Sequence, residues 1–295
     1  MTKSAVLTVC GRPNVGKSTL TNALVGEKIA IVSSKPQTTR NRITGIVQHG
    51  DTQFVLLDTP GFIRPRNRLG DYMVNVVKES VTDVDGVLFL VEPLIEPGPG
   101  ETALAEKLRS CGAPVLLVIN KIDTVEKDKL LGVIAAYSAL LPFEAVIPIS
   151  ARTGDGLDIL LEEMEKLAVE GPHLFPEDSI TDQPERQICA ELIREKLLAC
   201  LDKEIPHGTA VEIERFAERE NGIIDLEAVI YCEKNSHKGI IIGKNGAMLR
   251  EIGSRARTDI EALLGTKVYL QTWVRVKENW RDSEVLLRNF GYRDT

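Results

Sequence analysis

The sequence lacks the features of a secreted or membrane-spanning protein. The five cysteines, Cys10, Cys111, Cys189, Cys200 and Cys232, are odd in number and form no CxxC pair, so neither a disulfide framework nor a zinc site is indicated. No run approaches the roughly 18 consecutive apolar residues that a membrane-spanning helix needs. We therefore expect a soluble cytoplasmic protein, with peripheral contact at the inner face of the cell membrane left open.

Aromatic residues and positive charge are also scarce. Aromatics make up 5% of the chain and its net charge at pH 7 is -7. Proteins that coat nucleic acid non-specifically need a general excess of Lys and Arg, so any phosphate contact here has to be local. At 295 residues and 43% apolar content, the chain is long enough for two separate cores.

Short apolar runs alternate with longer helical patterns over the first half of the chain. The runs typical of strands are 5–10, 43–49, 53–58, 86–91, 115–119 and 145–149. The alternation predicts an α/β domain with a mostly parallel sheet, helices on both faces and ligand loops at the carboxyl ends of the strands. Gly50-Asp51 predicts a hairpin, so one edge of the sheet should be antiparallel.

A second domain follows a segment rich in Pro, Gly and acidic residues. We place the first domain at 1–170, the linker at 171–184 and a smaller α+β domain at 185–295. In the second domain we expect a helix near 185–203 and strands near 209–217, 223–232 and 267–276.

The first strand runs into GRPNVGKS, which fits the GxxxxGK[ST] phosphate loop and precedes a helical pattern. Backbone N–H groups of such a loop surround a β-phosphate, Lys17 reaches the β and γ oxygens, and Ser18 offers a hydroxyl to Mg²⁺. The residues expected to bind nucleotide here are Gly11, Arg12, Pro13, Asn14, Val15, Gly16, Lys17, Ser18 and Thr19.

The third strand ends in Asp58-Thr59-Pro60-Gly61, which places an acid beside the metal and a glycine N–H beside the γ-phosphate. The polar segment 35–42 is the expected switch loop. We expect Thr39, with Thr38 as the alternative, to join Ser18 and Asp58 as a metal ligand in the GTP state. A solvated basic loop is the competing interpretation of this segment.

Two further motifs select the base. They are Asn120-Lys121-Ile122-Asp123 and Ser150-Ala151-Arg152, which follow the fifth and sixth strands. Asp123 can accept hydrogen bonds from N1–H and the 2-amino group of guanine, and adenine lacks both donors, so discrimination of roughly 10⁴ to 10⁵ is expected. Lys121 should lie along the ring and Ala151 should donate to the guanine oxygen. The motifs together predict a site for GTP and GDP.

The motifs GRPNVGKS, QTTR, DTPG and NKID resemble those of the translation-factor-like class of small GTPases. The run 240–249, IIIGKNGAML, resembles a KH domain. With the segments 204–212 and 273–280, almost the whole chain resembles the Era family of bacterial GTPases. The resemblance implies a Ras-like GTPase joined to a type II KH domain, a monomer that binds the 3′ end of small-subunit 16S ribosomal RNA and assists maturation of the 30S subunit.

The residues themselves support RNA binding in a more general form. A GxxG loop between helices lets a sugar–phosphate backbone approach closely, and an apolar floor can hold unstacked bases. Residues 240–281 hold eight basic and four acidic side chains, which marks a phosphate-contacting face in an acidic protein. The predicted RNA-binding residues are Ile240, Ile241, Ile242, Gly243, Lys244, Asn245, Gly246 and Arg250. Trp273 and Trp280 are expected to pack inside the domain.

Phe62 stands where Ras-like enzymes carry the glutamine that orients the attacking water. A phenyl ring cannot hold water, so we expect slow intrinsic turnover. In related GTPases an asparagine at the position of Asn14 helps to coordinate K⁺, which makes K⁺ a candidate cofactor. The predicted catalytic residues are Lys17, Thr39, Gly61 and Asn14.

Two other functions stay open at this point. One is an RNA-binding assembly factor that holds GTP without hydrolysing it. The other is a membrane-associated GTPase whose basic face meets anionic lipid. A metabolic kinase is disfavoured because NKID selects guanine and DTPG belongs to a switch.

Overall fold

The computed structural model describes residues 1–62 and 65–292, and the chain divides into two compact units. The first unit consists of Met1–Ala30, Thr39–Pro65 and Met73–Asp182, and the second of Ile31–Thr38, Arg66–Tyr72 and Gln183–Thr295. Residues 293–295, the end of the predicted second domain, lie outside the described residues. Within the described part of the chain, no helix has both the length and the apolar character needed to cross a bilayer.

The first unit is built on a seven-stranded sheet. Its strands are β1 (Lys3–Gly11), β2 (Ile43–His49), β3 (Thr52–Asp58), β4 (Gly86–Val91), β5 (Val115–Ile119), β6 (Ala145–Pro148) and β7 (Val169–Glu170). The helices of this part of the chain are α1 (Lys17–Val25), α2 (Arg68–Ser80), α3 (Pro99–Leu108), α4 (Lys127–Ser138) and α5 (Leu157–Glu165). Of these, α2 begins in the second unit, to which Arg66–Tyr72 belong.

The sheet confirms the α/β fold class. Its strand order is β2-β3-β1-β4-β5-β6, with β7 paired to β1. β1, β3, β4, β5 and β6 run parallel, whereas β2 is antiparallel to β3, as the Gly50-Asp51 hairpin predicts. Every residue of β4 and β5 is buried, which is the pattern of central parallel strands covered on both faces.

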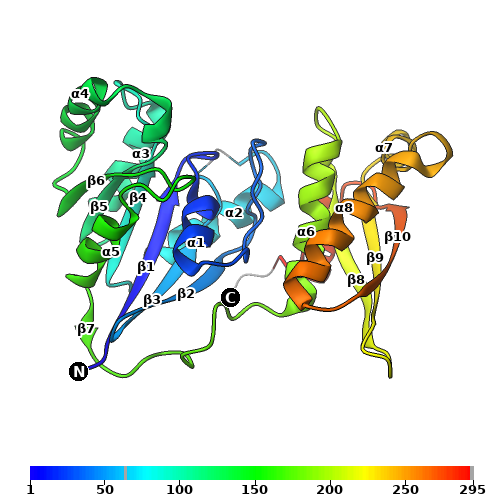
Figure 1. Ribbon diagram of the computed structural model, residues 1–295. Coiled ribbons are helices and arrows are strands. Elements are labelled where there is room, and N and C mark those ends of the chain that lie inside the picture. The colour runs from blue at the N-terminus through cyan, green and yellow to red at the C-terminus, as the bar shows by residue number, and fades with distance from the viewer. Residues whose placement is uncertain (63–64, 293–295) are drawn as a thin grey trace. The chain divides into compact units, whose positions relative to one another are not determined.

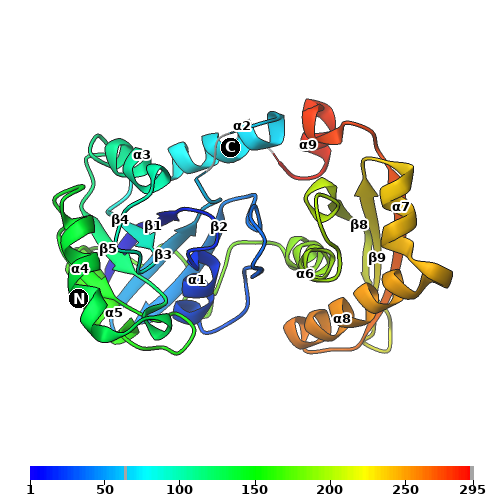
Figure 2. The same cartoon turned by 90° about the horizontal axis from the view of Figure 1, so that it is seen from above.

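Two hydrophobic clusters fill the space between the sheet and its helices. Leu20 of α1 and Leu160 of α5 belong to the cluster on one face. Leu104 of α3 and Tyr137 of α4 belong to the cluster on the other. Figures 1 and 2 show α1 and α5 together on one side of the sheet and α3 on the opposite side. Helices thus cover both faces of the sheet, and the loops at the carboxyl ends of the strands stay accessible to a ligand.

The segment that follows β7 is tied to β2 and β3 by hydrogen bonds. The side-chain oxygen of Gln53 accepts from the N–H groups of Leu174 and Phe175 at 2.8 and 2.9 Å, and its amide nitrogen donates to the carbonyl of Phe175 at 2.9 Å. The N–H of Ile46 donates to the carbonyl of Ile180 at 2.9 Å. The segment predicted as a linker is therefore anchored on the first unit as far as residue 182.

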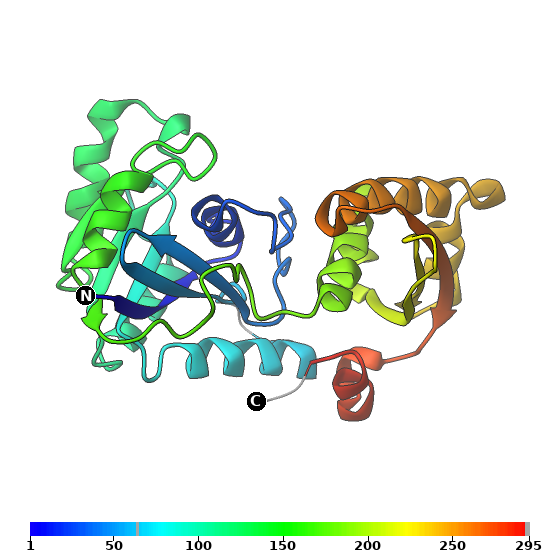
Figure 3. The ribbon, with the colours of Figure 1, turned by 60° about the horizontal axis from the view of Figure 1, so that its bottom comes forward.

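The second unit contains a three-stranded sheet of order β10-β9-β8, in which β10 is parallel and β8 antiparallel to β9. Its strands are β8 (Ala210–Glu218), β9 (Ile224–Cys232) and β10 (Val268–Val276), and its helices are α6 (Glu185–Cys200), α7 (Asn235–Ile242), α8 (Ala247–Leu264) and α9 (Glu284–Asn289). Figures 1 and 3 show α6 and α8 side by side on one face of this sheet. The core lies between them and the sheet, which confirms the α+β class.

The two tryptophans differ in environment. Trp280 is fully buried, and its indole N–H donates to the carbonyl of Gly208 at 2.9 Å, so the expectation of a packing role is confirmed. Trp273 is 40% exposed, and the same expectation is wrong for it. The cause is strand alternation: Val274 points into the core, so its neighbour Trp273 points to the opposite face of the sheet.

Residues 31–38, which include the start of the predicted switch loop 35–42, belong to the second unit. Ile31 lies in that unit's hydrophobic core. The N–H of Val32 donates to a carboxylate oxygen of Glu195 at 2.9 Å, and the buried Arg194 guanidinium donates to the carbonyl of Thr38. Helix α6 therefore holds both ends of this segment.

Burial controls the reactivity of the cysteines, all of which are free thiols. It raises the pKa of Cys10 and of Cys189 to about 12 and raises that of Cys232, so these thiols stay protonated at pH 8. We expect a thiol reagent such as 5,5′-dithiobis(2-nitrobenzoate) to label Cys111 and Cys200 in the native protein and all five after unfolding. Equal native rates for Cys10 and Cys111 would contradict this packing.

Candidate functional site

The phosphate loop joins β1 to α1 at the carboxyl edge of the sheet. Lys17 opens α1, and its ammonium group donates to the carbonyls of Gly11 and Arg12 at 3.2 and 2.9 Å. The side chain is only 6% exposed, and this burial lowers its pKa. An ammonium group buried inside the loop gives the loop a strong preference for an anion.

The three residues predicted to hold Mg²⁺ meet in space. The hydroxyl of Ser18 donates to Oδ2 of Asp58 at 2.6 Å and lies 2.8 Å from the hydroxyl of Thr39. The alternative ligand, Thr38, uses its hydroxyl to donate to the carbonyl of Lys35 at 2.7 Å. Of the two threonines, Thr39 is therefore the one beside Ser18 and Asp58.

The oxygens at this point fit Mg²⁺. Asp58 is fully buried, and its Oδ1 has no hydrogen-bond partner within residues 1–62 and 65–292. A buried carboxylate oxygen without a donor is costly, and Mg²⁺ is bound in nucleotide sites by one or two carboxylates together with hydroxyls, water and phosphate oxygens. Asp58, Ser18 and Thr39 would hold the ion, which would neutralise phosphate charge. Their ligand roles stay a prediction.

Burial raises the pKa of Asp58 to about 6, against an ordinary value of 3.8 and despite the opposing charge of Lys17. Between these two values the folded protein holds a proton that the unfolded chain has lost. In chelator and without nucleotide, the free energy of unfolding should therefore fall as pH rises from about 4 to about 6, by on the order of 3 kcal/mol from this group.

The matched comparison is Asp58→Asn, which keeps the size of the side chain but cannot titrate. Chemical denaturation of both proteins across this pH range isolates the contribution of Asp58. The wild-type protein should lose stability relative to the variant as pH rises. Parallel curves would show that the carboxyl titrates normally.

The loop after β3 packs directly on the phosphate loop. A Cβ atom on Gly61 would lie 2.7 Å from atoms of Pro13, so only glycine fits this approach. The N–H of Phe62 donates to the carbonyl of Gly11 at 3.1 Å. The hydroxyl of Thr59 is buried and donates to the carbonyl of Val9 at 2.9 Å, so it serves the packing of the loop. This loop can therefore contact a phosphate through its main-chain groups.

The ring of Phe62 is partly buried against the α3 and α4 side of the sheet. The ammonium of Lys107 lies 4.4 Å from the centre of this ring. The position after Gly61 therefore supplies no group that could orient water, in line with the expected slow turnover. Asn14, the predicted K⁺ contact, has a left-handed backbone with φ of 66°.

These features lead to a test with monovalent ions. We expect GTP to be hydrolysed faster in K⁺ than in Na⁺ buffer, because K⁺ would supply positive charge to the transition state. Asn14→Gly tolerates the left-handed backbone and should remove the difference between the two ions. Equal rates in K⁺ and Na⁺ for the wild-type protein would reject the role of K⁺.

Asn120 ties together the loops that surround the base site. Its side-chain amide donates to the carbonyl of Val15 at 2.8 Å, and its side-chain oxygen accepts from the N–H of Ala151 at 2.9 Å. One side chain thus connects the phosphate loop, the end of β5 and the loop after β6. The sequence predicts Asn120 as a nucleotide contact, and the structure shows that it organises the site.

Asp123 is poised to act as the acceptor for guanine. Ser150 donates to its Oδ1 at 2.7 Å, and the largely exposed Arg152 pairs with its Oδ2. The hydrogen bond from Ser150 is the main cause that lowers the pKa of Asp123, so the carboxylate is ionised at neutral pH. Arg152 and a bound guanine would compete for Oδ2.

The GxxG loop of the second unit lies between α7 and α8. Gly243 has φ of 71°, and a Cβ atom there would lie 2.7 Å from Cβ of Met248, so a side chain at this position would distort the loop. Lys244 and Asn245 are exposed. The loop therefore presents backbone and one cation to its surroundings.

The predicted floor of three isoleucines is wrong for Ile241. This side chain is fully buried in the core, whereas Ile240 is 49% exposed. Consecutive residues of a helix point about 100° apart, so Ile240, Ile241 and Ile242 of α7 cannot share one face. Ile240 is the most exposed of the three, and Ile242 is partly buried against the core.

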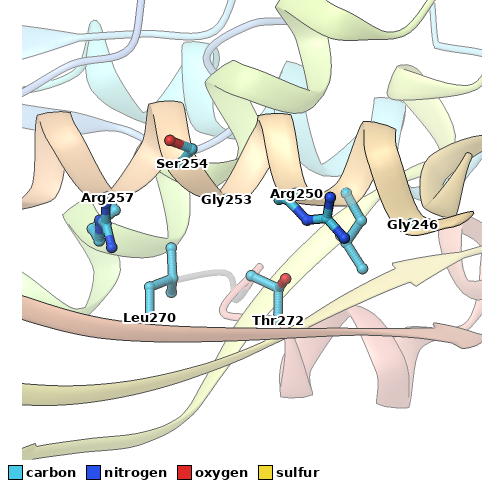
Figure 4. Close-up of a pocket in the computed structure, with 8 residues that line it drawn as sticks. Gly246, Arg250, Gly253, Ser254, Arg257, Leu270 and Thr272 are labelled. Atoms are coloured by element: carbon cyan, nitrogen blue, oxygen red, sulfur yellow. The ribbon is translucent and has the colours of Figure 1, made fainter.

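A groove of about 440 Å³ adjoins the loop, between α8 and β10. It is lined by Gly246, Leu249, Arg250, Gly253, Ser254, Arg257, Leu270 and Thr272. Figure 4 shows Arg250 and Arg257 pointing from α8 toward the strand that carries Leu270 and Thr272. The sequence-based site contains only Gly246 and Arg250 of this set. The helical spacing of 250, 254 and 257 and the alternation of 270 and 272 were the available signals.

The cations of this region fall into two groups. Arg255, Lys267, Arg275 and Arg281 pair with glutamates. Lys244, Arg250, Arg257 and Lys277 form no ion pair with a carboxylate in the described part of the chain. Three of these four cations lie at the loop and groove, where a phosphate backbone would find them available.

Two family comparisons agree with this division of the chain. Residues 6–121 match the family described as 50S ribosome-binding GTPase. Residues 204–281 match the KH domain family. The phosphate loop and the Asp58–Gly61 motif fall inside the first match, and the GxxG loop falls inside the second.

Similarity to characterised proteins extends over the whole chain. It is 53% identical to GTPase Era of Ruminiclostridium cellulolyticum over 99% of this chain and 98% of that one, and 52% identical to GTPase Era of Clostridioides difficile over the full length of both. A crystal structure of Era with MgGDPNP and nucleotides 1506–1542 of 16S ribosomal RNA superposes with a TM-score of 0.95 at 37% identity, over 99% of both chains. An Aquifex aeolicus Era variant bound to GDP·AlF₄⁻ gives the same TM-score and identity, over 98% of this chain and 99% of that one.

Proposed function

The chain belongs to the Era family of GTPases, and from this premise we propose that it is a GTP-hydrolysing switch that binds the 3′ end of 16S ribosomal RNA and assists maturation of the 30S subunit. Its nucleotide half assembles residues suited to phosphate and Mg²⁺, since Lys17 and the group of Ser18, Thr39 and Asp58 lie at one edge of the sheet. GTP or GDP with Mg²⁺ would be the ligand of this edge.

The groove between α8 and β10 is the observation that carries the RNA part of the proposal. It combines apolar side chains with Arg250 and Arg257, which form no close ion pair in the described part of the chain, and it continues from the GxxG loop. Single-stranded RNA needs both features, because its bases are unstacked and its phosphates are charged. The related Era captured with a 16S RNA fragment has the same fold at a TM-score of 0.95.

The position of Thr39 in the chain supports a switch. Thr39 belongs to the first unit and contacts Ser18, whereas residues 31–38 directly before it belong to the second unit. In GTPases, contacts to the γ-phosphate and Mg²⁺ order such a segment, and hydrolysis releases it. Closure of Thr39 on the metal would therefore act on residues that are hydrogen-bonded to α6.

The RNA proposal can be tested with charge reversals in the groove. We expect Arg250→Glu with Arg257→Glu to weaken binding of an oligonucleotide that copies the 3′ end of 16S RNA, measured by fluorescence anisotropy. The salt dependence of binding should become weaker. The negative slope of the logarithm of the association constant against the logarithm of salt concentration should move toward zero by about 0.7 for each lost phosphate contact. Basal GTP hydrolysis should be unchanged because these residues lie outside the nucleotide site.

Arg255→Glu is the control for each single reversal, Arg250→Glu or Arg257→Glu, because it changes the net charge equally. This arginine lies on the same helix, is exposed and is not part of the groove, so its reversal should affect RNA binding less. Equal losses for a single groove variant and the control would show that net charge, and not the groove, causes the loss. Binding to phosphatidylglycerol vesicles that RNA does not compete away would favour the lipid alternative instead.

We also propose a cytoplasmic monomer. The five free thiols support a reducing compartment. Peripheral contact with the inner face of the membrane is a further prediction that vesicle flotation would test.

A further inference from the structure

Glu101 is a buried carboxylate that the nucleotide motifs do not include. It lies in the first turn of α3, is 1% exposed, and pairs with the guanidinium of Arg12 in the phosphate loop. A carboxylate buried to this extent is stable only when it is paired. The pair thus connects α3 to the second residue of the loop that surrounds the phosphates.

The backbone before α3 leaves room for this pair. A Cβ atom on Gly98 would lie 2.9 Å from Oε2 of Glu101, and one on Gly100 would lie 3.0 Å from Cδ of Arg12. Side chains at these two positions would push the guanidinium or the carboxylate aside. Glycine at positions 98 and 100 therefore leaves room for both members of the pair, Glu101 and Arg12.

A second glutamate extends the connection to the base loop. Glu92 follows β4, lies 3.8 Å from the guanidinium of Arg12, and accepts a hydrogen bond from the ammonium of Lys121. The same ammonium donates to the carbonyl of Asn14 at 2.6 Å. Charges thus link α3 and the loops after β1, β4 and β5 in one continuous network.

We propose that Glu101 and Glu92 are positioning residues for guanine nucleotide, acting through Arg12 and Lys121. Arg12 and Lys121 are long side chains in loops, and ordering them on binding would cost entropy. The two glutamates hold them in place beforehand. The inference rests on the GTP and GDP site of the proposed function and is independent of the RNA groove.

Positioning has a kinetic signature that a purely structural pair lacks. The loops that the network fixes touch the nucleotide in the ground state and in the transition state alike. Loss of such uniform binding raises KM and leaves kcat nearly unchanged. A carboxylate in the first turn of a helix also stabilises the helix, and that effect appears in Tm.

The experiment compares Glu101→Gln and Glu92→Gln with Glu106→Gln, an exposed glutamate on α3. Affinity for a fluorescent N-methylanthraniloyl GDP is measured with excess Mg²⁺, together with KM, kcat and Tm. We expect about tenfold weaker GDP binding and a higher KM for the first two variants, kcat within about twofold of wild type, and no change for Glu106→Gln. Wild-type affinity in both Glu101→Gln and Glu92→Gln would overturn the proposal.

A second variant separates positioning from stability. Replacing the pair by Arg12→Met with Glu101→Met removes both charges, and such apolar replacements are often neutral or stabilising. Tm should recover relative to Glu101→Gln, but GDP binding should stay weak. If affinity returns together with Tm, the pair only supports the fold. Failure of the wild-type protein to bind guanine nucleotide would instead reject the proposed function itself.

Discussion

The burial of two opposite charges, Lys17 and Asp58, at one edge of a parallel sheet is the constraint on which the rest of the nucleotide site depends. Burial lowers the pKa of the ammonium and raises that of the carboxyl, and the attraction between the two charges opposes both shifts. A triphosphate with Mg²⁺ adds further opposite charge beside each group. Ligand binding therefore offsets part of the desolvation of both groups.

The same constraint explains the arrangement around the site. Long polar side chains must be held near the phosphates without filling the nucleotide's place, and neighbouring loops do this by mutual hydrogen bonds. Asn120 holds the carbonyl of Val15 and the N–H of Ala151. The groove of the second unit differs, because its exposed arginines can bind a flexible chain without burying charge.

The chain itself joins the two units next to the nucleotide site. Residues 31–38, which directly precede Thr39, belong to the second unit.

The fold class could be predicted because strand and helix patterns alternate along the first half of the chain. Phosphate and guanine chemistry allow few residue types at strand ends, and the sequence therefore indicated that Ser18, Thr39 and Asp58 meet, as they do in the structure. Glu101 could not be found, since an isolated glutamate at a helix start has no sequence signal for burial. Ile241 and Trp273 were misassigned because orientation on an element depends on its register against the core, which composition does not reveal.

We propose that the GTPase site and the groove of this Era-family protein work as one switch. The most direct measurement is GTP turnover in K⁺ and Mg²⁺ with an oligonucleotide copying the 3′ end of 16S RNA, beside a scrambled sequence of equal length. The account predicts that the matching RNA binds and stimulates turnover while the scrambled one does not. RNA that binds in the groove with no effect on turnover would contradict the claim, and the two units would then be independent modules.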